Sequence, residues 1–359
     1  MKKELLLATT VAGITLGAHT AGAVTASYSG HARVGLTDKD TDSNSADTGT
    51  MSSHQQASFS VSLEETTDNG TKISGGFDLT DESDGSTDLS GLTLTFDDGS
   101  TLQLIEAGDA AYNYEAAVPG ASGEQSIGAA TSNAAKSGID GVGGAGTIGL
   151  DWSSAADALD TEGLSFGVSY HNNDLSDATA SVNMDTSMSA GLSYATTSGD
   201  TTITVGVGFV EASDSNSCTN VDHSVWNIGA VAVNENDAGD KLTAGVGIGS
   251  GEFAYDQGGS IDDVADWEAV EAGISYVSGD LTFTASFGDA TAKDTAAGTV
   301  ASATEKEDSK ESLAMSIDYV VADGVTTTLG YLSAETAHEG TKQDSYSGSS
   351  WFVGTDLSF

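Results

Sequence analysis

The sequence predicts an all-β protein: a sixteen-stranded antiparallel β-barrel that spans a membrane, with short turns at one end and long loops at the other. Three observations lead to this expectation. Apolar residues alternate with small or hydroxylated residues along most of the chain, which is the period of strands with one apolar and one wet face. The connections are alternately short and long. Only 38% of the 359 residues are hydrophobic and 7% aromatic, which is little for one packed interior.

The physics of a membrane accounts for all three observations. In hydrocarbon every backbone polar group must be paired, so a spanning sheet has to close and leave no edge. Apolar side chains then face lipid, small polar ones face a water-filled lumen, and no packed core is needed. A large secreted β-sandwich would alternate in the same way, but it would not separate short turns from long loops so regularly. The barrel is therefore the preferred interpretation.

Residues 1–23 have the pattern of a secretory signal peptide. Two lysines follow Met1, an apolar run begins at Leu5, and Ala21-Gly22-Ala23 matches the small-residue cleavage pattern. The apolar run is too short for a spanning helix, which needs about 20 apolar residues. We expect export and a barrel formed by residues 24–359.

Each of the sixteen strands is expected where the alternation is clearest. Leu164, Phe166 and Val168, for example, alternate with Ser165 and Gly167. The predicted strands are 24–36, 53–65, 71–80, 89–97, 101–109, 146–153, 163–173, 184–196, 201–212, 223–234, 240–254, 266–277, 281–291, 311–321, 324–334 and 349–359.

The connections that follow even-numbered strands are mostly tight and contain glycine. Asn69-Gly70, Asp98-Gly99 and Asp323-Gly324 are typical of hairpin turns, because glycine adopts positive φ freely. One such connection, 154–162, is longer and predicts a short turn of helix. The connections after odd-numbered strands are longer and acidic, and 110–145 is the longest. An interfacial aromatic girdle is expected from residues near strand ends: Tyr170, Tyr194, Tyr276, Tyr319, Trp351 and Phe352.

Charge and motifs exclude several functions. There are 54 acidic and 11 basic residues, a net charge of −43, so the basic surface that nucleic-acid binding needs is missing. The single cysteine, Cys218, cannot form an internal disulfide. The serines form no nucleophile elbow, the histidines have no zinc spacing, and the Gly-x-Gly pairs lie inside strands, so no enzyme is predicted. No cofactor is required.

Calcium is the one metal left open. Calcium takes six to eight oxygen ligands, and carboxylates cluster in the predicted outer loops. No EF-hand or glycine-rich nonapeptide repeat occurs, so a specific site is the minor alternative to plain solvated charge. The candidate residues are Asp38, Asp40, Asp42, Asp262 and Asp263.

Motifs at both ends and in the middle resemble general bacterial outer-membrane porins, especially the alphaproteobacterial type. Ser29-Gly30-His31-Ala32-Arg33-Val34-Gly35 is similar to that family's first strand, and Gly108-Asp109-Ala110 to its entry into a long third loop. The chain ends in Phe359 after alternating apolar residues, like the ending that the family's assembly machinery recognises. The resemblance covers nearly the whole mature chain. It implies a sixteen-stranded barrel in the outer membrane, usually a homotrimer surrounded by lipid, that passes small hydrophilic solutes by diffusion.

The resemblance also implies that the third loop, 110–145, folds into the lumen and constricts the pore. Its acidic side would consist of Asp109, Glu115, Glu124 and Asp140, and the facing wall of His31, Arg33, His54 and Lys72. Members of the family usually set loop acids against a row of arginines, and this chain has only Arg33. Each loop carboxylate is as readily interpreted as plain solvated charge.

Rings of carboxylates attract cations, so we expect a weakly selective, cation-preferring channel. The alternative function is a secreted or surface-attached acidic β-rich protein with a structural or calcium-binding role.

Overall fold

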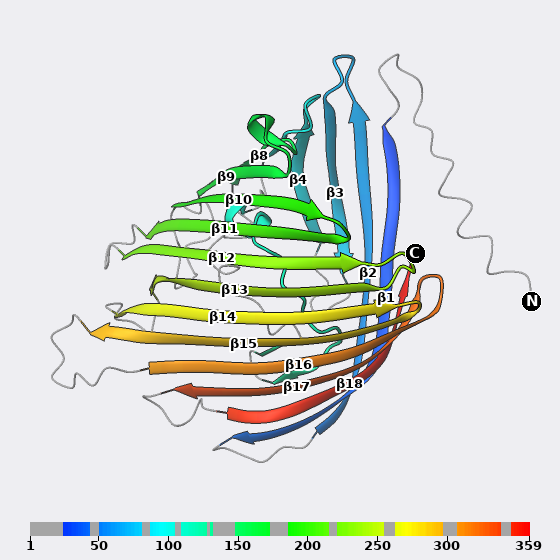
Figure 1. Cartoon of the computed structure of the whole chain (residues 1–359), viewed down its shortest axis with the longest axis vertical. Helices are drawn as coiled ribbons and strands as arrows, with labels where there is room; N and C mark the ends of the chain where they lie inside the picture. The colour runs from blue at the N-terminus through cyan, green and yellow to red at the C-terminus, as the bar shows by residue number, and fades with distance from the viewer. Residues whose placement is uncertain are drawn as a thin grey trace, which may run out of the picture.

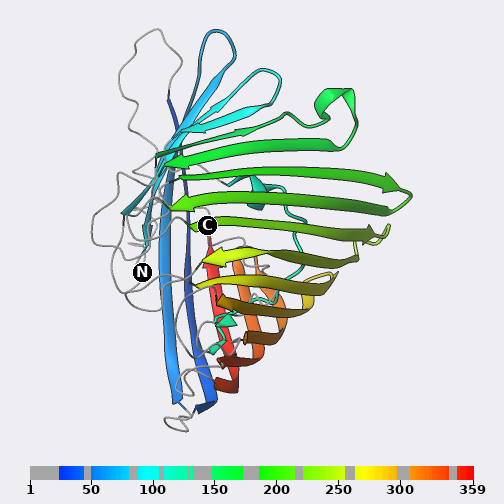
Figure 2. The ribbon, with the colours of Figure 1, turned by 90° about the vertical axis from the view of Figure 1, so that its left-hand side faces the viewer.

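A computed structural model describes residues 24–43, 50–80, 87–104, 109–127, 130–131, 148–172, 186–214, 221–254, 263–296, 307–338 and 346–359. Sixteen of its strands form one closed barrel (Figures 1 and 2). Their bounds are β1 Thr25–Ser43, β2 Thr50–Thr66, β3 Lys72–Thr80, β4 Thr87–Thr95, β5 Thr101–Leu104, β8 Ile148–Ser153, β9 Leu164–Asn172, β10 Thr186–Ser198, β11 Thr201–Asp214, β12 Val221–Glu235, β13 Lys241–Ala254, β14 Asp263–Ser278, β15 Leu281–Ala296, β16 Glu307–Ala322, β17 Val325–His338 and β18 Tyr346–Ser358.

Neighbouring strands in the sequence are neighbours in the barrel, and all pairs are antiparallel. β1 closes the sheet by pairing with both β2 and β18, with Arg33 opposite Gln56 on one side and Asp356 on the other. Two short strands, β6 (Ser126–Ile127) and β7 (Ala130–Thr131), pair separately within the third loop. The predicted fold class and strand count are thus confirmed, strand for strand.

The main differences lie at strand ends. β1 continues to Ser43, although alternation of apolar residues stops at Leu36. Its extension pairs with β2 and β18 through backbone hydrogen bonds, which need no apolar side chains. Asp38 and Asp40 therefore lie on a strand and not in a loop. The described part of β5 ends at Leu104, and residues 105–108 lie outside the described residues. The predicted end at residue 109 is wrong, because Asp109 caps the next element.

The tight turns are all at one end of the barrel. Each of the seven connections at this end contains one glycine with positive φ, which side chains other than glycine rarely adopt. These glycines are Gly70, Gly99, Gly163, Gly199, Gly239, Gly279 and Gly324. In the longest of these connections, the predicted helical turn is a three-residue 3₁₀ helix, Ala158–Asp160.

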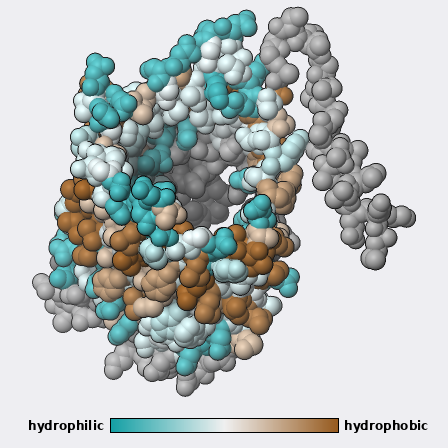
Figure 3. Space-filling view, turned by 45° about the vertical axis from the view of Figure 1, so that its right-hand side comes forward, coloured by the Kyte–Doolittle hydropathy of each residue, from teal (hydrophilic) through white to brown (hydrophobic). Residues whose placement is uncertain are grey.

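The two faces of each strand have opposite chemistry. Exposed apolar side chains cover the outside, and Figure 3 shows them as a band on one face of the wall with hydrophilic residues above and below it. The inner residues that alternate with them are mostly glycine, alanine, serine and threonine. Within the described residues, no helix is both long and apolar enough to cross a membrane.

Five of the six residues expected in the aromatic girdle face outwards. Tyr170, Tyr194, Tyr276, Tyr319 and Trp351 lie on the outer face, each at least 40% exposed. The prediction that Phe352 joins them is wrong, because adjacent residues of a strand point to opposite faces. Trp351 is 50% exposed on the outside, whereas Phe352 is 1% exposed on the inner side of the wall.

Candidate functional site: the lumen and the inner belt

The first half of the third loop lies inside the barrel. We call residues 109–126 the inner belt (cyan to teal in Figures 1 and 2). It begins with a short helix, α1 (Ala110–Asn113), whose N-cap is Asp109: its Oδ1 accepts a hydrogen bond of 2.9 Å from the backbone N–H of Ala111. Asn113 Nδ2 donates to Asp151 Oδ2 on β8 at 2.9 Å. These contacts fix the start of the belt against the wall.

A row of inner-face glycines gives the belt room to lie close to the sheet. A Cβ atom added at any of them would meet belt atoms within 3.2 Å, and at some would overlap them. We call them the glycine track: Gly167 on β9, Gly191 on β10, Gly206 and Gly208 on β11, Gly229 on β12, Gly245 on β13 and Gly273 on β14. The belt thus runs along the wall across successive strands.

Beyond β14, serines and alanines replace the glycines. The hydroxyls of Ser286 and Ser316 accept hydrogen bonds from the backbone N–H groups of Ala121 and Ser122, at 3.4 and 2.9 Å. Ala121 also packs into a fully covered cluster of Ala314, Leu332 and Ala334. The belt satisfies its backbone against the wall here, so this part of the loop lines the barrel instead of hanging free.

The far end of the belt is attached to β1. Arg33 Nη1 donates to Glu124 Oε1 of the belt, and Arg33 Nε donates to Asp356 Oδ2 on β18 at 2.9 Å. Lys39 Nζ donates to Ser126 Oγ at 2.8 Å. Underneath, Phe352 fills the space beside Gly123, which has φ +106. Sequence reasoning placed Arg33 and Glu124 on opposite sides of a constriction, and the structure brings them into contact.

Two of the other three predicted wall residues, His31 and Lys72, have polar partners. His31 Nδ1 lies 2.7 Å from Ser58 Oγ, and Lys72 Nζ lies 3.0 Å from Glu64 Oε1. The His54 ring meets Phe352 edge to face, with its Nε2 4.0 Å from Glu124 Oε2. Of the predicted acidic side, Asp109 caps α1 and Glu115 and Glu124 lie on the belt. Asp140 falls outside the described residues.

The described candidate calcium ligands are spread over two strands. Asp38 and Asp40 alternate on the outer face of β1, and Asp263 begins β14. Asp262 lies outside the described residues. Among the residues that the structure describes, no group of three or more acidic, histidine or cysteine residues could hold a metal ion. Calcium binding stays a prediction.

Sequence reasoning missed the glycine track. Gly206-x-Gly208 and Gly245-x-Gly247-x-Gly249 were recognised as strand glycines and excluded as phosphate loops, but no role was assigned to them. Their placement could have revealed the track. Glycines recur on the wet face of successive strands, where serine or threonine would face water equally well. An inner face without side chains predicts close approach of another segment.

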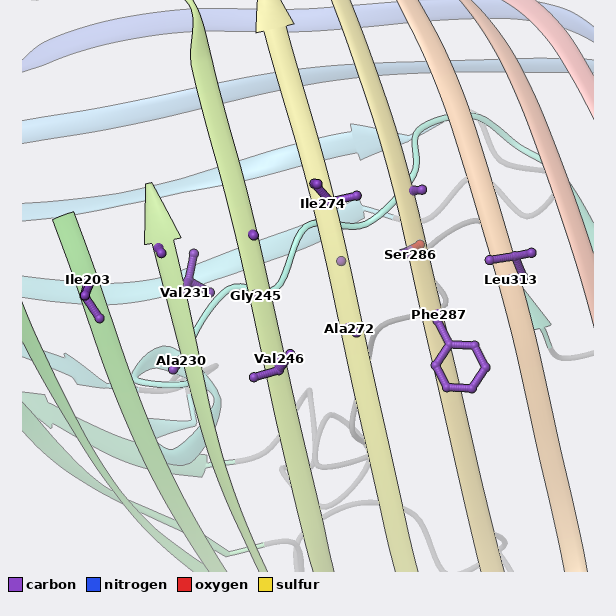
Figure 4. Close-up of a pocket in the computed structure, with 14 residues that line it drawn as sticks. Ile203, Ala230, Val231, Gly245, Val246, Ala272, Ile274, Ser286, Phe287 and Leu313 are labelled. Carbon is purple, nitrogen blue, oxygen red and sulfur yellow. The ribbon is translucent and has the colours of Figure 1, made fainter. Parts of the chain in front are cut away.

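The outer wall also carries a hollow of about 480 Å³, separate from the lumen. Alanines form its floor and larger apolar side chains, including Ile203, Ile274 and Leu313, frame it (Figure 4). Gly245 and Gly273 belong to both the hollow and the glycine track. The wall is therefore thin here, with the belt on one side and the membrane-facing hollow on the other.

Comparison with solved structures gives the fold. An OmpT loop-deletion mutant of Vibrio cholerae, described as an outer membrane protein, is 12% identical with a TM-score of 0.59, over 94% of this chain and 99% of that one. The outer membrane channel DcaP of Acinetobacter baumannii is 14% identical with a TM-score of 0.58, over 94% and 97%. The anion-selective porin of Comamonas acidovorans is 11% identical with a TM-score of 0.56, over 94% and 100%.

No protein-family model matches the sequence, and no curated protein matches it at a significant level. The chain therefore has the sixteen-stranded barrel fold of bacterial outer-membrane porins, at sequence identities too low to transfer the function of any one of them.

Proposed function

We propose that this protein is an outer-membrane porin: a passive, cation-preferring diffusion channel for small hydrophilic solutes and ions. The observation that carries this proposal is a closed barrel with an apolar outside, a wet inside and an inner belt lying against the wall. An apolar outer band requires lipid, and a wet inner face requires water. We propose no chemistry beyond passage and no enzyme activity.

Cation preference rests first on the lumen charges. Three described basic side chains there are already bound: Arg33 to two carboxylates, Lys72 to Glu64 and Lys39 to a hydroxyl. The Arg33 group thus keeps a net negative charge. Further carboxylates occupy inner-face positions of the described wall: Asp78, Asp151, Glu271 and Asp318.

The mouth at the short-turn end supports the same preference. Each of the seven turn connections contains at least one aspartate and no lysine, arginine or histidine. We call these carboxylates the turn ring: Asp68, Asp97, Asp98, Asp157, Asp160, Asp200, Asp237, Asp240, Asp280 and Asp323. A ring of one sign around an opening raises the local concentration of the opposite ion. The Comamonas porin is described as anion-selective, so the fold alone does not determine ion preference.

Single-channel recording tests the proposal. We expect ion-conducting steps in a planar bilayer, and a reversal potential of the sign that marks cation preference when a salt gradient is applied. Replacing Asp68, Asp237, Asp280 and Asp323 with asparagine should move the reversal potential towards zero. Anion preference of the wild type would refute the electrostatic part of the proposal, and the absence of any conductance would refute the channel itself.

Location and assembly are part of the proposal. A cleaved signal of residues 1–23 and the terminal Phe359 fit export and insertion into the outer membrane, where the barrel contacts lipid. Phe359 extends β18 by exchanging backbone hydrogen bonds of 3.1 Å with Gly30. A homotrimer is proposed, by analogy with the trimer form described for Vibrio cholerae OmpT. Membrane fractionation, mobility shifts between unheated and boiled samples, and sedimentation in detergent would test these points.

A further inference from the structure

The chain has one arginine, and its side chain joins three separate elements. Arg33 lies on the inner face of β1, Asp356 directly opposite on β18, and Glu124 at the far end of the inner belt. The guanidinium presents several donors in a planar fork, which suits it to hold two carboxylates at once. The carboxylate of the barrel seam orients the guanidinium, and the guanidinium then holds the belt.

The ion pair between Arg33 and Glu124 is partly buried. The side chains of Arg33 and Glu124 are 29% and 28% exposed, so the belt and wall cover most of each. Phe352, buried beneath Gly123, and the edge of His54 close the apolar side of the site. Gln125 lies over Gly330, so the residues on both sides of Glu124 are seated in the wall.

The contact of Arg33 with Glu124 lies at the far end of the belt. The start of the belt is fixed by α1 and its middle by the glycine track, and its end at β6 lies against β1, β17 and β18. The attachment at Glu124 therefore determines how closely this end of the belt stays against the wall.

We propose that Arg33 is a positioning residue: with Asp356 it latches the belt at Glu124 and so sets the pore cross-section, a role separate from the charge that it contributes to the lumen. This rests on the proposed channel function for its consequence, but the latch itself is a property of the fold. Without the latch, the end of the belt would fluctuate and the open channel would become noisy.

The experiment compares Arg33→Gln and Glu124→Gln with the matched control Lys72→Gln. Lys72 also forms an inner-face ion pair, with Glu64, but that pair joins β2 to β3 and does not touch the belt. Hydrogen exchange in micelles reports on the latch. We expect amides 118–127 to exchange about tenfold faster or more in both latch variants, because local opening becomes easier, and to be unchanged in Lys72→Gln.

Single-channel recording reports on the consequence. We expect larger open-channel noise and added substates in the two latch variants only, whereas Arg33→Gln and Lys72→Gln both shift the reversal potential through lost charge. Arg33→Lys keeps the charge but loses the fork, so it should keep the selectivity and still raise exchange. The double variant Arg33→Gln/Glu124→Gln should be no worse than either single variant.

Equal exchange in Arg33→Gln, Glu124→Gln and Lys72→Gln would overturn the latch. Glu124→Gln alters no barrel strand, so it keeps the test valid if the Arg33 variants fail to fold. If the wild type conducts no ions, the proposed function fails while the exchange measurement still tests the latch.

Discussion

Asp109 shows how a predicted pore charge can have a structural role. Its carboxylate caps α1 through Ala111, and asparagine is as good an N-cap as aspartate, whereas alanine costs about 1 kcal/mol at such a position. We therefore expect Asp109→Asn to leave hydrogen exchange in residues 110–116 unchanged and Asp109→Ala to accelerate it. If Asp109 instead acts only through its charge, both variants would shift the reversal potential equally and neither would change exchange.

Asp98 illustrates a local hydrogen-bond network in a tight turn. The Ser100 hydroxyl and backbone N–H donate to Asp98 Oδ1 at 2.6 and 2.9 Å, and these bonds lower the pKa of Asp98 below the ordinary 3.8. Because the folded pKa is depressed, the charged form stabilises the turn above the unfolded pKa, and this stabilisation is lost as the pH falls through the folded value. We expect Ser100→Ala to raise the pKa of Asp98 in an NMR titration. The stability difference between the two proteins should shrink as the pH falls below 3.8.

The sequence predicted the face on which a residue lies better than the contacts that its side chain makes. Facing directions followed from alternation, so the inner placement of Arg33 and Lys72 was foreseeable. The contact of Arg33 with Glu124 was not, because it joins positions 91 residues apart through a loop of irregular backbone. Phe352 was misassigned to the girdle because its aromatic type was weighed more than its place beside Trp351.

Strands and turns were largely predictable from the sequence. A strand that separates lipid from water needs alternating apolar and polar residues, and a two-residue turn needs glycine. Both patterns can be recognised in the amino-acid sequence. Strand ends beyond the membrane need only backbone pairing, which explains why β1 and β2 run further than expected. The path of the belt could not be predicted, because the glycines of different strands align into one track only when the barrel closes.

The glycine track makes a direct prediction about the belt. A Cβ at Gly273 would overlap the carbonyl oxygen of Pro119, whereas a Cβ at Gly75 would meet only one backbone atom, at an ordinary 3.4 Å. Gly273→Ala should therefore push the belt off the wall, since overpacking typically costs about 1–3 kcal/mol. We expect faster exchange in residues 115–123 and a lower single-channel conductance. Gly75→Ala is the control and should match the wild type; identical behaviour of both variants would mean that the belt does not rest on the track.

For the molecule as a whole, the structure shows where part of the net charge of −43 lies. In the lumen, Arg33 and Lys72 are paired with acids, while the seven turns contribute acids alone. A packed soluble protein with this charge would mainly repel itself, whereas a barrel can place charge around an opening. Selectivity can then arise at two ranges: contact within the lumen, and a longer-range field at the mouth.

Ionic strength separates these two ranges. The screening length is about 10 Å in 0.1 M salt and about 3 Å in 1 M salt, so a field from the turn ring should fade over this interval while contact interactions persist. We expect the ratio of cation to anion permeability, measured from reversal potentials at a fixed salt gradient, to fall as mean salt rises from about 0.1 M to about 1 M. In the variant with Asp68, Asp237, Asp280 and Asp323 changed to asparagine, the ratio should be lower at low salt and nearly equal to that of the wild type at high salt. A wild-type ratio independent of salt would instead assign the selectivity to the carboxylates of the lumen, because their distances to a passing ion are shorter than the screening length.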